Sequence, residues 1–224
     1  RAGKAHQIRD GSQYQSGFRR RRSSLPIRLQ GCPVGCSWCD TKQTWEKEQD
    51  KESTLGDIAL KTIDSDLWAM ASGEALIQLM KEKHFSAQHI VITGGEPCIY
   101  DLQPLTGILE QHGYQCQIET SGTYPIQCTD NTWVTVSPKV GMKGGLQVIS
   151  QAVNRANEIK HPVAREKDIE ALEKILALRT VEPSPSVALQ PISQKAAATK
   201  LCIATCIQRN WRLSIQTHKY LDIQ

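Results

Sequence analysis

The stretch Gly31-Cys32-Pro33-Val34-Gly35-Cys36-Ser37-Trp38-Cys39-Asp40-Thr41 places three cysteines in one short loop, with the spacing C-x3-C-x2-C. A structural zinc site closes its metal with four protein ligands, and this loop supplies only three. Three thiolates suit a [4Fe–4S] cluster that keeps one iron free for another ligand. The loop therefore predicts an iron–sulfur cluster held by Cys32, Cys36 and Cys39, with an open coordination position where chemistry takes place.

Around this loop, short apolar runs alternate with helix-like segments over residues 25–224. Such alternation predicts βα units around a parallel sheet, which is an α/β fold. The strands that the pattern predicts are 27–29, 89–93, 115–120, 132–137, 187–190 and 212–216. The predicted helices are 56–62, 72–83, 102–112, 146–156, 168–178 and 196–209.

Short polar motifs follow the ends of several predicted strands. The cysteine loop follows the first strand, Gly94-Gly95-Glu96-Pro97 the next, Ser121-Gly122 a third and Ser137-Pro138-Lys139 a fourth. Because the carboxyl ends of parallel strands lie at one edge of a sheet, and functional groups gather there, we expect these motifs to form one site.

Charge is distributed unevenly along the 224 residues. Residues 1–24 hold seven basic residues and one acidic residue, which is +6, whereas residues 25–224 hold 20 basic and 22 acidic residues, which is −2. We therefore interpret 1–24 as an atypical N-terminal segment and 25–224 as a single domain. Because no basic stripe continues into that domain, no nucleic-acid partner is expected.

The sequence shows neither a run of about 18 apolar residues nor a signal-peptide pattern. We therefore expect no membrane association and a cytoplasmic location. In such a reducing compartment the eight cysteines are better suited to metal binding than to disulfides. The five cysteines outside the loop are predicted to be small packing residues.

The cysteine loop, joined to Gly94-Gly95-Glu96-Pro97, resembles the radical S-adenosylmethionine enzymes. The resemblance implies that the free iron is chelated by the methionine part of S-adenosylmethionine. One electron from the cluster would then release a 5′-deoxyadenosyl radical. The Gly-Gly-Glu-Pro segment would hold the methionine amino group, since glycine lets backbone approach the cofactor closely.

A larger set of motifs is similar to the 7-carboxy-7-deazaguanine synthase family over residues 25–224. The similarity implies a partial, open (β/α) barrel and a radical ring contraction of 6-carboxy-5,6,7,8-tetrahydropterin to 7-carboxy-7-deazaguanine, with release of ammonia, on the route to queuosine. It also implies Mg²⁺, a homodimer, and an electron donor such as flavodoxin or ferredoxin. The motifs are 27–32, 39–41, 91–98, 119–122, 137–139, 190–193 and 216–220.

The same resemblance assigns roles residue by residue, without naming a catalytic acid or base. Thr41 would bind Mg²⁺, a hard ion that prefers oxygen ligands, and Arg28 would bind the substrate carboxylate as a bidentate fork. The implied S-adenosylmethionine contacts are Gly94, Gly95, Glu96, Ser121, Ser137, Pro138, Lys139 and Gln190. The implied pterin contacts are Arg28, Thr93, His218 and Gln224.

One stretch departs from the family pattern. The family has an apolar N-terminal strand and a Leu-Gln-Gly-Glu-Gly run that holds the pterin, whereas residues 13–17 read Gln-Tyr-Gln-Ser-Gly and no apolar strand precedes Arg28. We expect residues 1–24 to reflect an altered reading frame or a divergent start. The pterin pocket would then be incomplete, so that turnover is lower while cluster and cofactor binding survive.

Three other classes of protein remain open from the sequence. A glycyl-radical activase, another radical enzyme, shares the C-x3-C-x2-C spacing. A zinc-binding interaction module would need a fourth ligand. A non-catalytic, metal-binding relative is compatible with the altered N-terminal motif.

Overall fold

The computed structural model describes residues 5–8, 23–59, 65–192 and 195–216. The strands are β1 Ala5–Ile8, β2 Ser24–Leu29, β3 His89–Gly94, β4 Gln115–Thr120, β5 Trp133–Val136, β6 Glu158–Val163, β7 Ser186–Pro191 and β8 Arg212–Leu213. The helices are α1 Leu55–Ala59, α2 Gly73–Glu82, α3 Gln103–Gln111, α4 Ser150–Arg155, α5 Glu166–Leu176 and α6 Ala196–Arg209. Short 3-10 turns are η1 Lys42–Thr44, η2 Gln49–Lys51 and η3 Pro97–Ile99.

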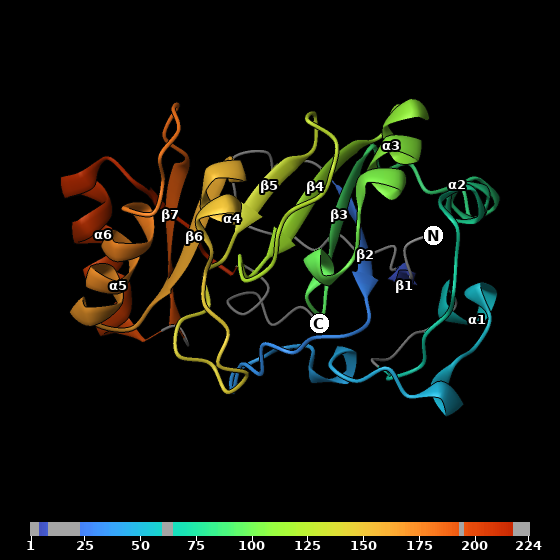
Figure 1. The fold of residues 1–224 in the computed structure, drawn as a ribbon, viewed down its shortest axis with the longest axis horizontal. Helices are drawn as coiled ribbons and strands as arrows, with labels where there is room; N and C mark the ends of the chain where they lie inside the picture. The colour runs from blue at the N-terminus through green and yellow to red at the C-terminus, as the bar shows by residue number, and fades with distance from the viewer. Residues whose placement is uncertain (1–4, 9–22, 60–64, 193–194, 217–224) are drawn as a thin grey trace.

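The strands form one eight-stranded sheet whose spatial order follows the chain, from β1 to β8. Neighbours from β2 to β8 are parallel, and β1 pairs antiparallel with β2. Within the described residues β1 and β8 stand at opposite ends of this order, so the sheet is open (Figure 1). This arrangement confirms the predicted α/β fold in its partial-barrel form.

One face of the sheet is apolar and carries the core. Ile27, Ile92, Ile118, Val134 and Ile159 are fully buried on successive strands. Helices α3, α4, α5 and α6 pack against β4, β5, β6 and β7 (Figure 1). Burial of these branched side chains, on the order of 1.5–3 kcal/mol each, is the main stabilising contribution of this layer.

The opposite face is polar along its middle strands. Gln117 and Glu119 on β4, Thr135 on β5, and Glu158 and Lys160 on β6 are all buried or nearly so and hydrogen bond to one another. A buried polar face is costly unless its groups are paired. The sheet therefore has a packing side and a side on which polar groups are displayed.

Several predicted elements are confirmed almost to the residue. Ser72 caps α2, its hydroxyl accepting a hydrogen bond from the Ala75 N–H at 3.1 Å. A serine hydroxyl in this position satisfies one of the free N–H groups of the first helical turn and fixes where the helix begins. Gly113 ends the α3 segment with φ +84°, a left-handed conformation that glycine adopts without penalty.

Other predictions need correction. A strand at Glu158–Val163 was not predicted, because its sequence carries charges on one face and a proline in its interior. Pro162 is tolerated because the β5 pairing of this strand covers only Glu158 and Ile159, so the missing N–H faces no partner on that side. The α4 helix begins at Ser150 rather than at 146, since the Ile149 N–H bonds to the Gly122 carbonyl at 3.0 Å instead.

Three further differences concern the ends of the described chain and of its elements. The strand Ala5–Ile8, which pairs with β2 by backbone hydrogen bonds, is not among the predicted strands. Strand β8 ends at Leu213, short of the predicted 216, and α5 begins two residues before the predicted 168. The predicted end of the first helix, 60–62, lies outside the described residues. Across the described ranges, no helix has the length and hydrophobicity needed to cross a membrane.

Candidate active site

The cysteine loop leaves the carboxyl end of β2 and is tied to the turn that follows it. The Gly31 N–H donates to the Thr44 carbonyl at 2.8 Å, and the Cys32 N–H donates to the Trp45 carbonyl at 2.9 Å. Inside the loop the Cys39 N–H donates to the Cys36 carbonyl at 3.1 Å. These backbone bonds fix where the three thiols emerge without using any of the thiols themselves.

A second brace comes from the chain after β5. The Gly144 N–H donates to the Val34 carbonyl at 3.0 Å. A Cβ on Gly144 would lie 2.0 Å from the Pro33 carbonyl oxygen, so only glycine permits this approach. The cysteine loop is therefore packed against a segment distant from it in sequence.

The thiols differ in environment. Cys36 is 8% exposed, whereas Cys32 and Cys39 are half-buried. Burial raises the pKa of Cys32 and of Cys36, and the nearby Lys139 ammonium acts in the opposite direction on the Cys36 pKa. Since a metal binds the thiolate, a cation beside Cys36 favours cluster binding.

The donor set fits a cluster better than a single ion. Among the described residues, no three His, Cys, Asp or Glu side chains are close enough together to hold one metal ion. The thiolates of a [4Fe–4S] cluster bind different irons at separate corners, so they stand farther apart than the ligands of one ion. Three cysteines on one braced loop would each bind a different iron and leave the fourth iron without a protein ligand.

Gly94 and Gly95 hold the end of β3 against the start of the cysteine loop. Gly94 has φ +107°, and the Gly95 N–H donates to the Leu29 carbonyl at 2.8 Å. A Cβ on Gly95 would lie 2.2 Å from the Gly31 carbonyl oxygen. The two glycines thus allow a backbone approach that any side chain would prevent.

Glu96 lies beneath this junction and is 2% exposed. Its carboxylate accepts hydrogen bonds from the Cys98 N–H at 3.0 Å, from the Ser121 N–H at 2.8 Å, and from the Thr120 and Ser121 hydroxyls. The carboxylate therefore joins the end of β3 to the end of β4. The predicted contact of Ser121 with S-adenosylmethionine stays a prediction, and in this structure the Ser121 side chain binds Glu96.

Replacing Glu96 with glutamine is expected to destabilise the protein by about 2–3 kcal/mol, since hydrogen bonds to a charged acceptor are lost. The amide NH₂ would face a backbone N–H, either that of Cys98 or that of Ser121, and neither can turn to accept. Urea unfolding measures the effect. Glu110→Gln is the matched control, because among the described residues Glu110 accepts from the hydroxyls of Thr129 and Thr132, which can rotate. Equal unfolding midpoints for Glu96→Gln and Glu110→Gln would contradict the assignment.

Ser137-Pro138-Lys139 follows β5 and points its cation toward the cysteine loop. The Ser137 N–H donates to the Thr120 carbonyl at 2.7 Å, and Lys139 Nζ donates to the Ser137 carbonyl at 2.9 Å and to its hydroxyl at 2.7 Å. Burial lowers the pKa of Lys139, while the neighbouring Cys36, Glu96 and Glu119 act to raise it. The structure thus brings three of the predicted motifs together: the cysteine loop, Gly94-Gly95-Glu96 and the Ser-Pro-Lys turn.

The remaining predicted site residues are distributed as follows. The Thr41 hydroxyl is 3.5 Å from the Gly94 carbonyl and 3.7 Å from Cys39 Sγ, at the edge of the cysteine loop. Arg28 and Thr93 are paired in register on β2 and β3, and Gln190 lies farther along the sheet on β7. His218 and Gln224 lie outside the described residues.

The sequence analysis did not identify the polar residues that β4, β5 and β6 place on the polar side of the sheet. Gln117 and Glu119 alternate with apolar neighbours along β4, and that alternation is the signal that would have identified them. Lys160 forms an ion pair with Glu119, and both side chains are 11% exposed. These groups lie on the same side of the sheet as Arg28 and Thr93.

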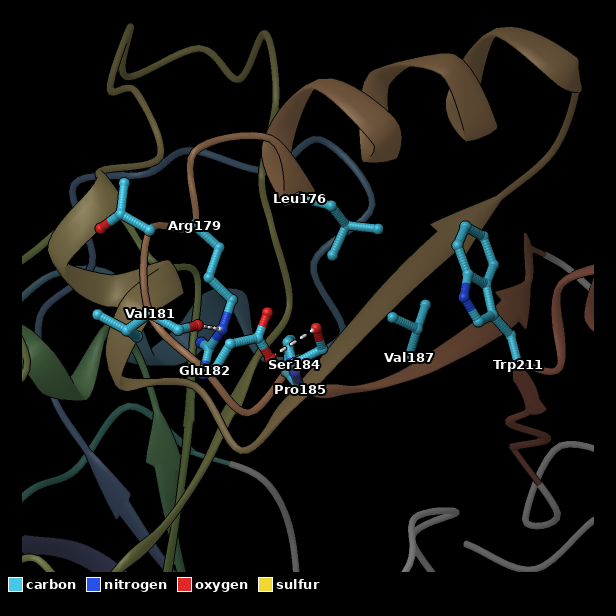
Figure 2. A pocket seen from close by; sticks show the side chains of 9 residues that line it. Leu176, Arg179, Val181, Glu182, Ser184, Pro185, Val187 and Trp211 are labelled. Atoms are coloured by element: carbon cyan, nitrogen blue, oxygen red, sulfur yellow. Dashed lines mark hydrogen bonds between the residues drawn. The ribbon is translucent and has the colours of Figure 1, made fainter.

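A separate cavity of about 460 Å³ lies away from these motifs (Figure 2). It is lined by the segment between α5 and β7 and by Trp211, so it lies at the amino ends of the strands. The Arg179 guanidinium in its wall donates to the carbonyls of Val181, Val153 and Pro183, among others. This arginine holds the surrounding backbone, and no cluster of reactive side chains lines the cavity.

Comparisons with known proteins agree with this site. A family model described as a 4Fe-4S single cluster domain matches residues 17–137. The chain is 63% identical over 197 residues to 7-carboxy-7-deazaguanine synthase of Escherichia coli (strain K12), covering 88% of each protein. It is 46% identical over 201 residues to the protein of the same name from Buchnera aphidicola, covering 90% of each. The crystal structure of QueE from Escherichia coli superposes with a TM-score of 0.92 at 56% identity, covering 95% of this chain and 93% of the other.

Proposed function

The chain belongs to the 7-carboxy-7-deazaguanine synthase family, and from that premise we propose that it converts 6-carboxy-5,6,7,8-tetrahydropterin into 7-carboxy-7-deazaguanine, with release of ammonia, in queuosine biosynthesis. It is a radical S-adenosylmethionine enzyme with an iron–sulfur cluster. The observation that carries the proposal is the meeting of the cysteine loop, Gly94-Gly95 and Ser137-Pro138-Lys139 at one edge of the sheet.

When bound, the cluster and S-adenosylmethionine supply the radical chemistry. The protein orients the substrate against the cofactor and excludes water from the site. Cys32, Cys36 and Cys39 would hold the cluster, and the backbone at Gly94-Gly95 would bind the methionine end of the cofactor. Lys139, held in place by hydrogen bonds to Ser137, would place a positive charge beside the cluster and the cofactor. Arg28 and Thr93 would bind the pterin, since they share the polar side of the sheet.

The test is a reaction under anaerobic conditions with reconstituted iron and sulfide, 6-carboxytetrahydropterin, S-adenosylmethionine, Mg²⁺ and a reductant. Mass spectrometry should detect 7-carboxy-7-deazaguanine and 5′-deoxyadenosine. 5′-Deoxyadenosine alone would place a defect in the pterin pocket, where residues 13–17 read Gln-Tyr-Gln-Ser-Gly in place of the family's run. The absence of both products from cluster-loaded protein would contradict the proposed function.

Mg²⁺ belongs to the proposal through Thr41, whose hydroxyl lies at the junction of the cysteine loop and Gly94. Thr41→Val keeps the side-chain shape and removes the oxygen, so the Mg²⁺ concentration for half-maximal rate is expected to rise by about tenfold or more. Titration of activity with Mg²⁺ measures this. Thr41→Ser, which keeps the oxygen, is the control, and an unchanged Mg²⁺ dependence of Thr41→Val would remove Thr41 from the proposed site.

We further infer a homodimer and a flavodoxin or ferredoxin as the electron donor. Both inferences follow from family membership. Light scattering after size-exclusion chromatography tests the homodimer. The electron donor is tested by replacing the chemical reductant with each reduced donor protein in the same assay. A monomer at all protein concentrations, or no turnover with either donor, would contradict the respective inference.

A further inference from the structure

The polar side of the sheet contains a continuous chain of hydrogen bonds that no role assigned so far explains. The Thr135 hydroxyl donates to Glu158 Oε2 at 3.0 Å, and Gln117 Nε2 donates to the Thr135 oxygen at 3.3 Å. The same Gln117 nitrogen donates to Glu119 Oε1 at 3.0 Å, and Lys160 Nζ donates to Glu119 Oε2. Side chains from three adjacent strands thus form one linear path from Glu158 to Lys160.

The hydrogen bonds of Thr135 and Gln117 have a fixed direction because they lie between two carboxylates, those of Glu158 and Glu119. Glu158 accepts, so the single hydroxyl proton of Thr135 must point toward it. The Thr135 oxygen then accepts from Gln117, which turns the amide NH₂ of Gln117 toward both Thr135 and Glu119. Glu158 therefore determines the orientation of an amide that in turn holds the Glu119 carboxylate.

Glu158 is a poor candidate for a purely stabilising residue. Its side chain is 1% exposed, and Oε1 is buried without a hydrogen-bond partner among the described residues. A buried carboxylate oxygen that lacks a partner reduces stability rather than adding to it. Residues kept at such a cost are characteristic of sites in which function and stability oppose each other.

The end of the hydrogen-bond chain at Glu119 and Lys160 lies among the residues proposed to bind the substrate. Arg28 pairs in register with Thr93, and the β3–β4 pairing of Ile92 with Ile118 places Glu119 in the same row across the sheet. Thr135 and Glu158 continue this row on β5 and β6. The residues proposed for S-adenosylmethionine, such as Ser137 and Lys139, lie beyond it, after the strand ends.

We propose that Glu158 is a positioning residue which, through Thr135 and Gln117, holds Glu119 and its partner Lys160 for contact with the pterin substrate. The inference rests on the proposed function. A carboxylate next to an ammonium offers an acceptor and a donor, which match the N–H and C=O groups along the pyrimidine edge of a pterin. The row that contains Arg28 and Thr93 favours the pterin over S-adenosylmethionine as the ligand of this pair.

The test is Glu158→Gln, which keeps the side-chain volume. The amide can present its NH₂ to Thr135, which would turn the Thr135 hydroxyl and, in consequence, Gln117. We expect the dissociation constant of oxidised 6-carboxypterin, followed by its own fluorescence, and the rate of 7-carboxy-7-deazaguanine formation each to worsen by about 10–100-fold. S-adenosylmethionine binding and the cluster absorbance should stay unchanged, and the midpoint of thermal unfolding should be equal or higher.

Further variants distinguish a positioning role of Glu158 from a purely structural role. Thr135→Val breaks the chain and should reproduce the Glu158→Gln effect, Thr135→Ser should restore near-normal binding, and the double variant Glu158→Gln/Thr135→Val should be no worse than either single one. Glu110→Gln, in which a carboxylate away from this row also accepts from threonine hydroxyls, is the matched control.

Three outcomes would overturn the inference: normal pterin binding by Glu158→Gln, a loss confined to S-adenosylmethionine binding, or a loss that accompanies a lower unfolding temperature. A wild-type protein that binds 6-carboxypterin but forms no 7-carboxy-7-deazaguanine would contradict the proposed reaction instead. The binding comparison between wild type and Glu158→Gln would still decide the positioning role, so the two failures are distinguishable.

Discussion

Replacing Cys36 with serine is expected to abolish 7-carboxy-7-deazaguanine formation, with a loss on the order of 10⁴-fold or more, as when one member of a unit that acts together is removed. Serine is nearly isosteric, and Cys36 lies buried in a loop fixed by backbone bonds, so the fold should survive. A hydroxyl is a poor ligand for iron, so the cluster should be lost or unstable. Iron and sulfide content, visible absorbance and product formation measure the result.

The control for this substitution is Cys128→Ser. Cys128 is half-buried, forms no disulfide and lies outside the cysteine loop, where its sulfur accepts a hydrogen bond from Arg155. That variant should keep the cluster and near-normal activity. If Cys36→Ser bound iron and formed product like Cys128→Ser, the assignment of the three-cysteine cluster would be wrong.

The second large effect is expected for Gly95→Ala. The new Cβ would lie 2.2 Å from the Gly31 carbonyl oxygen and 2.7 Å from its carbon, and both are backbone atoms that cannot rotate away. Relief requires β3 and the cysteine loop to separate, which strains the Gly95–Leu29 and Glu96–Gly31 hydrogen bonds. A displacement of about 1 Å at a reacting site costs about 100-fold in rate, and the overpacking itself is expected to cost about 1–3 kcal/mol of stability.

Activity and urea unfolding of Gly95→Ala should both be compared with Gly107→Ala. Gly107 lies inside α3, where a Cβ would meet only Thr129 Cγ2 at 4.0 Å. Alanine is the better helix former, so this control should be stabilised by up to about 1 kcal/mol, with unchanged activity. Gly95→Ala with wild-type turnover would show that the close approach to Gly31 is not required.

The sequence predicted the apolar framework well because that framework depends on pattern. Ile90 and Ile92 on β3, and Cys116 and Ile118 on β4, are buried where the runs of apolar residues indicated. The same patterning failed for β6, since Glu158 and Lys160 put charge into a strand that a periodicity argument treats as apolar. These charges lie on the side of the sheet where we propose that the substrate binds, and a binding site breaks the pattern that packing imposes.

The candidate site was predictable where it is local and unpredictable where it depends on long-range contacts. Three cysteines in a short loop can be identified from spacing alone. The brace by Gly144 and the carboxylate of Glu96 that ties Cys98 to Ser121 depend on segments far apart in the chain. No local pattern indicates those contacts, and the cofactor contact that the resemblance implies for Glu96 stays a prediction.

The match between strand order and chain order has a consequence for biosynthesis. A nascent chain can add β2, β3 and β4 one after another as it leaves the ribosome, because each new strand pairs with the preceding one. The cysteine loop emerges directly after β2, but the Gly144 segment that braces it emerges only after β5. During that interval the three thiols are present before their support exists. Delivery of iron and sulfide is therefore expected to follow translation, and a truncated chain that stops before β5 should capture iron poorly and be readily oxidised.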